Sequence, residues 1–106
     1  MDPVQLQNWP FSASAACYRQ DLTDADANLA LPVGGYFVHL VSSELKGCTL
    51  KLGGAAAAPT SGGGAVDGMV LSPGVPMTLV VRTAAALHGI MNATSATGVL
   101  YLTKVR

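Results

Sequence analysis

The stretch Pro73-Gly74-Val75-Pro76-Met77-Thr78-Leu79-Val80-Val81-Arg82 decides the fold class of this chain. A Pro-Gly turn signal and a second proline precede a run of β-branched and aliphatic side chains, which is typical of a strand. Successive side chains of a strand point to opposite faces, which sets Met77, Leu79 and Val81 against Thr78, Val80 and Arg82. We therefore predict a strand over residues 77–82 with one face fully buried, and we place it at the centre of a sheet.

The rest of the chain repeats this pattern of short apolar runs separated by Gly, Pro, Ser, Asn and Asp. Strands are predicted over residues 13–20, 29–33, 36–41, 48–52, 67–72, 84–91 and 99–105. Together with residues 77–82 they make about eight short antiparallel strands, the pattern of an all-β sandwich or jelly roll in a single domain. The main ambiguity is residues 83–91, where three alanines and a leucine would also suit a short helix.

Residues 1–14 differ from the rest and predict an extended N-terminal arm, followed by a β-sandwich domain over residues 15–106. The arm holds two prolines and the only tryptophan, Trp9, which Pro10 restricts to an extended conformation. Its apolar side chains include Leu6, Trp9 and Phe11, which we predict as interface residues. They offer a surface that docks either on the chain's own domain or on a neighbouring subunit.

The composition indicates an exterior that other protein chains cover. Of the 106 residues 50% are hydrophobic and only 11% are charged, against about a quarter charged in ordinary soluble domains. Isolated soluble domains use charge to stay apart from their neighbours, so this deficit favours a buried interface. The alternative is that Ala and Gly, which are tolerated anywhere, inflate the hydrophobic count.

Net charge and hydropathy patterning exclude two classes of partner. The formal net charge is zero and the basic residues are scattered along the sequence. The chain therefore lacks the basic face that a nucleic-acid binder needs. No apolar run approaches the roughly 18 residues needed to span a bilayer, and Met1-Asp2-Pro3 does not begin a signal peptide. We expect a chain made in a cytoplasm that stays soluble or joins an assembly there.

Residues 53–65, GGAAAAPTSGGGA, form an uncharged low-complexity segment that predicts a loop. Pro59 and the flanking glycines stop any helix that the alanines would start. Long loops inside small domains are usually functional or mobile. Because its side chains are small, this loop could pack flat against a partner through Ala56, Ala57 and Pro59; the alternative is a flexible, solvated loop.

The sharpest chemical pattern is Asp24-x-Asp26-x-Asn28, which matches the first ligand positions of a calcium-binding loop. However, Leu29 stands where such a loop has glycine, and Gly35 stands where it has a bidentate glutamate. We therefore favour a solvated polar turn and predict no metal and no cofactor.

Other reactive side chains form no catalytic motif, so we do not expect an enzyme. His39 and His88 lie in mid-strand without a third ligand at suitable spacing, which favours partly buried, hydrogen-bonded histidines. Cys17 and Cys48 form no C-x-x-C pair, and in a reducing compartment we expect both to be small buried hydrophobes, with a mutual disulfide as the alternative.

The second half of the chain resembles one group of proteins in the order and spacing of its apolar stretches and small-residue loops. The resemblance runs from Tyr36-Phe37-Val38-His39-Leu40 and residues 49–54, across a small-residue loop, through residues 73–79 and 87–90 to Gly98-Val99-Leu100-Tyr101-Leu102. These stretches look like the small capsid decoration, or cement, and head-accessory proteins of tailed bacteriophages. The resemblance covers about residues 35–106, is one of style rather than of a signature motif, and carries over no functional residue.

The resemblance implies a β-sandwich or jelly-roll module that sits as a dimer or trimer on the outer shell of a virion. It would bind the major capsid protein and bridge neighbouring subunits, without direct contact to nucleic acid or membrane. Two alternatives stay open: a head-tail connector or fibre-base module, and a small carbohydrate-binding module. The latter would use Trp9, Tyr18, Tyr36 or Tyr101 as a stacking platform.

Overall fold

The computed structural model describes residues 16–59 and 68–106, and these form eight β-strands in one domain. A membrane-spanning helix is absent from these two ranges. The prediction of an all-β fold of eight antiparallel strands is confirmed. The strands are β1 (Cys17–Leu22), β2 (Ala27–Leu31), β3 (Gly34–Val41), β4 (Cys48–Leu52), β5 (Met69–Leu71), β6 (Met77–Val81), β7 (Ala85–Met91) and β8 (Gly98–Lys104).

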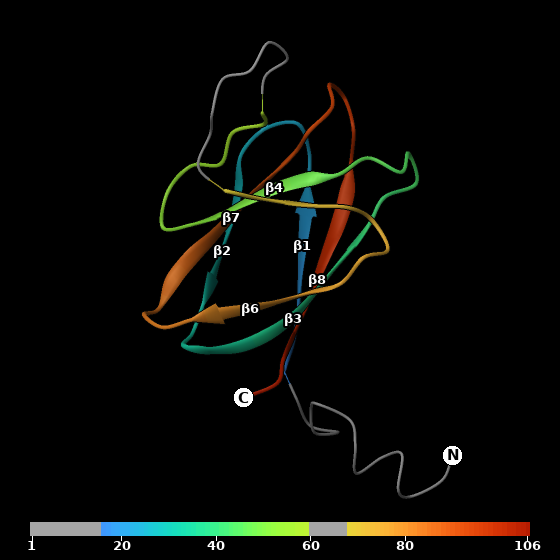
Figure 1. Ribbon diagram of the computed structural model, residues 1–106. Helices are drawn as coiled ribbons and strands as arrows, with labels where there is room; N and C mark the ends of the chain where they lie inside the picture. Colours follow the sequence, from blue (N-terminus) through green and yellow to red (C-terminus); the bar gives the residue numbers. More distant parts are fainter. Residues whose placement is uncertain (1–15, 60–67) are drawn as a thin grey trace, which may run out of the picture.

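The strands make two four-stranded sheets that pack face to face (Figure 1). Sheet A has the order β1-β8-β3-β6 and sheet B the order β2-β7-β4-β5. Strand β1 pairs with β8, β2 with β7, β3 with β6 and β4 with β5, always antiparallel. This is the pattern of one long hairpin rolled up on itself, which is a jelly roll.

The core lies between the sheets, where alternate residues of each strand meet. In β3, Tyr36, Val38 and Leu40 are fully buried, as the alternation of that strand requires. The other large buried side chains are Leu22, Leu31, Cys48, Leu50, Leu71, Val81, Leu87, Met91, Leu100 and Leu102. Because both sheets supply these aliphatic groups, one continuous apolar layer holds the sandwich together.

Residues 85–91 form strand β7, so the helical alternative for this stretch is wrong. Leu87 and Met91 point into the core, and Gly89 lies between them on the same face. A Cβ atom at Gly89 would lie 2.8 Å from Leu22 Cδ2 and 3.2 Å from Leu50 Cδ2. Glycine stands here because the two sheets approach too closely for a side chain.

Among the described residues the first strand begins at Cys17, with Ala16 outside it, and the predicted start over residues 13–15 lies outside the described residues. Its register with β8 runs from Cys17 opposite Thr103 to Leu22 opposite Gly98. The apolar content of residues 13–20 did not reveal that Asp21 and Leu22 belong to the ladder. Leu22 is 1% exposed and reaches β7 across the core, so tertiary packing sets the boundary.

Strand β6 lies at the edge of sheet A, so its predicted place at the centre of a sheet is wrong. The Pro-Gly turn before it forms as predicted: Gly74 has φ near +79° and the Val75 N–H donates to Ser72 O over 3.3 Å. However, Met77 and Leu79 are only partly buried, and Val80 is 48% exposed. The apolar alternation of β6 identifies its inward face, but it does not indicate whether the strand has one neighbouring strand or two.

The outer face of sheet B is partly covered by the connection between β4 and β5. Thr49 was predicted to point outward, and it does, yet it is 1% exposed. Its hydroxyl donates to Asn92 Oδ1 over 2.7 Å. A Cβ at Gly68 would lie 2.8 Å from the Thr49 methyl group, so the returning chain covers this side chain.

Candidate functional site

Of the predicted interface residues, the structure describes only those of the β4–β5 loop. Leu6, Trp9 and Phe11 lie outside the described residues. Ala57 and Pro59 are exposed, whereas Ala56 is 6% exposed and points inward. The predicted interface role of Ala56 is therefore at odds with its burial, whereas Ala57 and Pro59 are left exposed on the loop.

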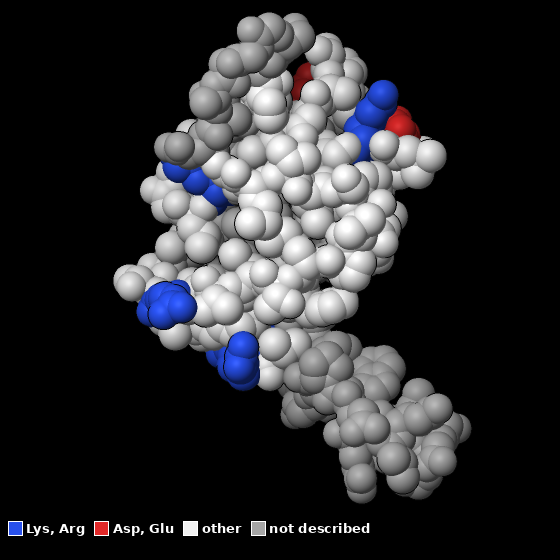
Figure 2. Space-filling model, in the orientation of Figure 1, with Lys and Arg blue, Asp and Glu red and all other residues white. Residues whose placement is uncertain are grey.

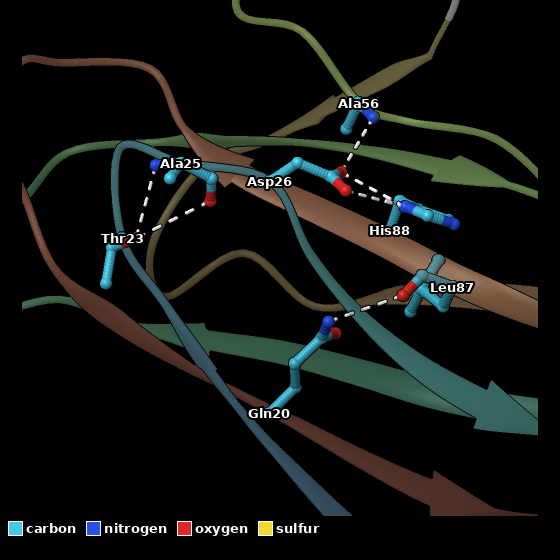
Figure 3. Close-up of polar contacts among 7 residues, drawn as sticks. All are labelled: Gln20, Thr23, Ala25, Asp26, Ala56, Leu87 and His88. Carbon is cyan, nitrogen blue, oxygen red and sulfur yellow. Dashed lines mark hydrogen bonds and ion pairs between the residues drawn. The ribbon is translucent and has the colours of Figure 1, made fainter.

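Asp26 is the residue that fastens this loop (Figure 3). Its carboxylate accepts the Ala56 N–H over 2.9 Å and lies 2.9 Å from His88 Nδ1 on β7. The Ala56 hydrogen bond, followed by the one from His88, lowers the pKa of the Asp26 carboxyl below its usual value. The carboxylate thus joins three segments that are distant in the sequence: the β1–β2 turn, the β4–β5 loop and strand β7.

The other acidic residue of this turn, Asp24, also serves the backbone. Its Oδ2 accepts the Ser95 N–H over 2.8 Å, where Ser95 has a positive φ of 61° in the β7–β8 turn. Asn28 lies in β2 opposite His88. Within residues 16–59 and 68–106 no group of three or more His, Cys, Asp or Glu side chains is placed to hold a metal ion. The turn is a structural hub that ties one end of the sandwich together.

The two histidines lie on opposite outer faces of the sandwich. His39 alternates with the buried Val38 and Leu40 and therefore faces outward from sheet A, whereas His88 faces outward from sheet B. Both are partly buried, as predicted. Because the core separates them, they cannot bind one ion together.

Two of the tyrosines predicted as a stacking platform pack against each other. Tyr36 is fully buried, its hydroxyl donates to Pro32 O over 2.6 Å, and burial raises its pKa. Tyr18 packs edge-on against it, with ring centroids 6.1 Å apart. The hypothesis that Tyr36 stacks on a sugar is wrong, because its ring belongs to the core.

The cysteines are free and differ in environment. Cys48 is fully buried, and this burial raises the pKa of its thiol to about 11. Cys17 is exposed on the edge strand β1, where its sulfur accepts a long hydrogen bond from the Thr103 hydroxyl. The prediction of two buried cysteines is right for Cys48 and wrong for Cys17, because Cys17 points away from the core, on the same face of β1 as the exposed Arg19 and Asp21.

The two long sides of the sandwich are built differently, and we name them the closed side and the open side. On the closed side, β1 contacts β2 and β7 of the other sheet. The Gln20 amide crosses between the sheets and donates to Leu87 O over 3.3 Å (Figure 3). Polar and apolar side chains therefore join the two sheets along this edge.

On the open side, a groove of about 200 Å³ lies between β6 of sheet A and strands β4 and β5 of sheet B. Most of its lining is apolar and comes from Leu50, Leu52, Met69, Met77, Leu79 and Leu87. Met69 is 53% exposed at its rim. We call this feature the open-side groove. The sequence pattern does not reveal this groove, because an edge strand and a central strand share the same apolar alternation.

Large apolar side chains are also exposed on and beside β5 and β6. Val70, Val75 and Val80 are each about half exposed or more, at 56%, 60% and 48%. In Figure 2, which has the orientation of Figure 1, the surface over β5 and β6 is white and Lys and Arg side chains lie toward its edges. A surface of this kind is typical of a protein interface.

The comparison with solved structures finds a distant likeness. No protein-family model and no curated protein matches the chain. Among solved structures, the chain is similar to one described as "Bacillus endospore appendages form a novel family of disulfide-linked pili". The identity is 17% and the TM-score 0.45, and the match covers 84% of this chain and 82% of that chain. A likeness at this TM-score carries no argument about function.

Proposed function

We propose that this chain is a structural virion protein: a decoration, or cement, protein that binds the outer shell of a tailed-bacteriophage capsid and stabilises contacts between major capsid subunits. The observation that supports this most directly is the exposure of large apolar side chains on and between the two edge strands that border the open side. Val70 is exposed on the outer face of sheet B, Val80 on the outer face of sheet A, and Val75 in the connection between β5 and β6. Monomeric soluble proteins rarely leave such a surface uncovered.

A cement protein needs a rigid body and apolar contact surface rather than reactive groups. The jelly roll provides the body, and the carboxylates of Asp24 and Asp26 are used to hold its turns together. Because the same contact recurs over many copies on a shell, each contact can be weak and the lattice still gains avidity. The proposed partners are the major capsid protein and further copies of this chain as a dimer or trimer. It would be made in the host cytoplasm and act on the capsid surface.

Two other functions use the same fold. A head-tail connector or fibre-base module would also cover the open side with protein, and differs only in its place in the virion. A carbohydrate-binding module has less support, because Tyr36 is buried and Tyr18 packs against it. That function would depend on Tyr101 and on Trp9.

The test is co-sedimentation of the purified chain with undecorated capsids of its source phage. We expect binding at a fixed stoichiometry, and much weaker binding of the variant Val75→Lys/Val80→Lys. The matched control is Thr94→Lys, which adds a cation at an exposed turn residue on another part of the surface. A chain that ignores capsids and binds glycans as a monomer would overturn the proposal and favour the carbohydrate-binding module.

A further inference from the structure

We propose that the N-terminal arm of one copy adds a strand to the free edge of β6 in a second copy and places Val4 and Leu6 in the open-side groove. This inference rests on the proposed function in a repeated assembly and names the partner of the open side. It draws on three independent features: the unprotected edge of β6, the apolar groove beneath that edge, and the residue pattern of the arm.

Among residues 16–59 and 68–106, strand β6 is the least protected of the four sheet edges. Natural proteins blunt edges with charged residues, prolines or very short strands. Strand β1 carries Arg19 and Asp21 on its edge, β5 has only three residues, and β2 lies against β1 on the closed side. Strand β6, Met-Thr-Leu-Val-Val, is uncharged and consists largely of residues that favour strands.

The geometry of a sheet determines where an added strand would put its side chains. A strand paired with β6 continues sheet A, so every second side chain enters the layer that holds Met77 and Leu79. That layer faces Leu50, Leu52 and Leu87 across the open-side groove. At about 200 Å³, the groove is larger than the roughly 150 Å³ apolar cavity that takes up a benzene molecule.

The arm has the residue pattern that this site requires. Val4-Gln5-Leu6-Gln7 alternates apolar and polar side chains, so an extended segment directs Val4 and Leu6 to one face and both glutamines to the other. Residues 3–18 carry no charged side chain. The arm therefore brings no charge of its own into the groove, where a buried charge would be costly, and Lys51 is a charged residue among those that line the groove.

The arm joins the sandwich at the edge of sheet A that is opposite the proposed docking site. The arm leads into β1 at Ala16, whose carbonyl accepts the Lys104 N–H over 2.8 Å. Strand β6 lies at the other edge of the same sheet. Val105 and Arg106 hydrogen-bond to Gly35 at the end of β3, between these two edges. The 14 residues of the arm can span up to about 45–50 Å, which is enough to reach β6 of a neighbouring copy, and the trapping experiment below separates this from docking on the same chain.

The first test compares two arm variants of the full chain by sedimentation velocity over a concentration series. Val4→Asp/Leu6→Asp puts charges on the face predicted to enter the groove, and Gln5→Asp/Gln7→Asp puts the same charges on the opposite face. Neither changes a residue of the described sandwich. We expect the first variant to weaken self-association about tenfold or more and the second to change it much less. Equal effects of the two variants would overturn the inference.

The second test is disulfide trapping between copies in a Cys17→Ser background. Copies with Leu6→Cys are mixed with copies carrying Met69→Cys, at the rim of the groove, and oxidised in air with a copper catalyst. We expect a cross-linked dimer of the two variants. Leu45→Cys, at an 80% exposed loop position, and Gln5→Cys are the controls that should cross-link less. In a chain carrying both Leu6→Cys and Met69→Cys, cross-linking only within single chains would overturn the inference.

These results are distinguishable from failure of the proposed function. A chain that binds undecorated capsids but shows no groove-dependent association keeps the proposed function and loses this inference. A chain that neither associates nor binds capsids loses both.

Discussion

The closed and open sides of the sandwich differ in how closely the two sheets contact each other. Side chains join the sheets along the closed side, whereas a groove separates them along the open side. On the closed side, Leu22 is almost fully buried against β7, and Gln20 reaches the backbone of the opposite sheet. On the open side, Met77 and Leu79 line a groove instead of a sealed core. The closed side therefore contributes buried apolar contacts to stability, whereas the open side leaves apolar groups that could still gain free energy from burial.

The largest expected loss of stability is that of Leu22→Ala on the closed side, and Leu79→Ala on the open side is its comparison. Leu22→Ala should lower the free energy of unfolding by about 3 kcal/mol, since it opens a cavity in a sealed layer. Leu79→Ala should lower it by only about 1 kcal/mol, since this side chain is already partly in water. Urea unfolding of the two variants measures the difference. Equal losses would show that the two sides are equally closed.

Gly89→Ala tests how tightly the closed side is packed. The added methyl group meets Leu22 Cδ2 and Leu50 Cδ2, so we expect a loss of about 1–3 kcal/mol in the free energy of unfolding. In the Leu22→Ala background the methyl group has room, and its cost should fall or change sign. Additive losses in the double-mutant cycle would contradict this packing.

Asp26→Ala tests the polar hub beside the closed side. It removes the acceptor of the Ala56 N–H and the partner of His88, and we expect a loss of about 1–2 kcal/mol at pH 7. Because the folded-state pKa of Asp26 is lowered, its contribution is fully present above the unfolded-state pKa of about 3.9. It is lost as the pH falls through the lower folded-state pKa. Unfolding curves of both proteins should therefore converge in acid, and a constant gap would contradict the ionic role.

The smallest expected effects are at Gln20 and Val80. Gln20→Leu removes a hydrogen bond to Leu87 O but also a buried Oε1 for which no partner is found among the described residues. We expect these to offset within about 1 kcal/mol. Val80→Lys, on the exposed face of β6, should change the free energy of unfolding by no more than about 0.5 kcal/mol. Thermal unfolding of both variants checks this, and a large loss at Val80 would show that the exposed face of β6 is structurally necessary.

The sequence predicted the positions of the strands more accurately than it predicted which residues from elsewhere in the chain contact them. Strand β4 was predicted with its observed bounds, because Cys48, Leu50 and Leu52 alternate with Thr49 and Lys51. The burial of Thr49 was missed, because it depends on Gly68 and Asn92, which come from other parts of the chain. The hub at Asp26 was missed for the same reason: its partners, Ala56 and His88, lie 30 and 62 residues away.

By itself, the sequence determined the fold class, since apolar alternation, β-branched residues and turn signals are local properties that act on a few neighbouring residues. The tertiary structure alone decided which strands lie at the edges, which side of the sandwich is sealed and which thiol is exposed. These properties depend on contacts between residues far apart in the chain, and the alternation of a single strand contains no information about them. The open-side groove belongs to this second group.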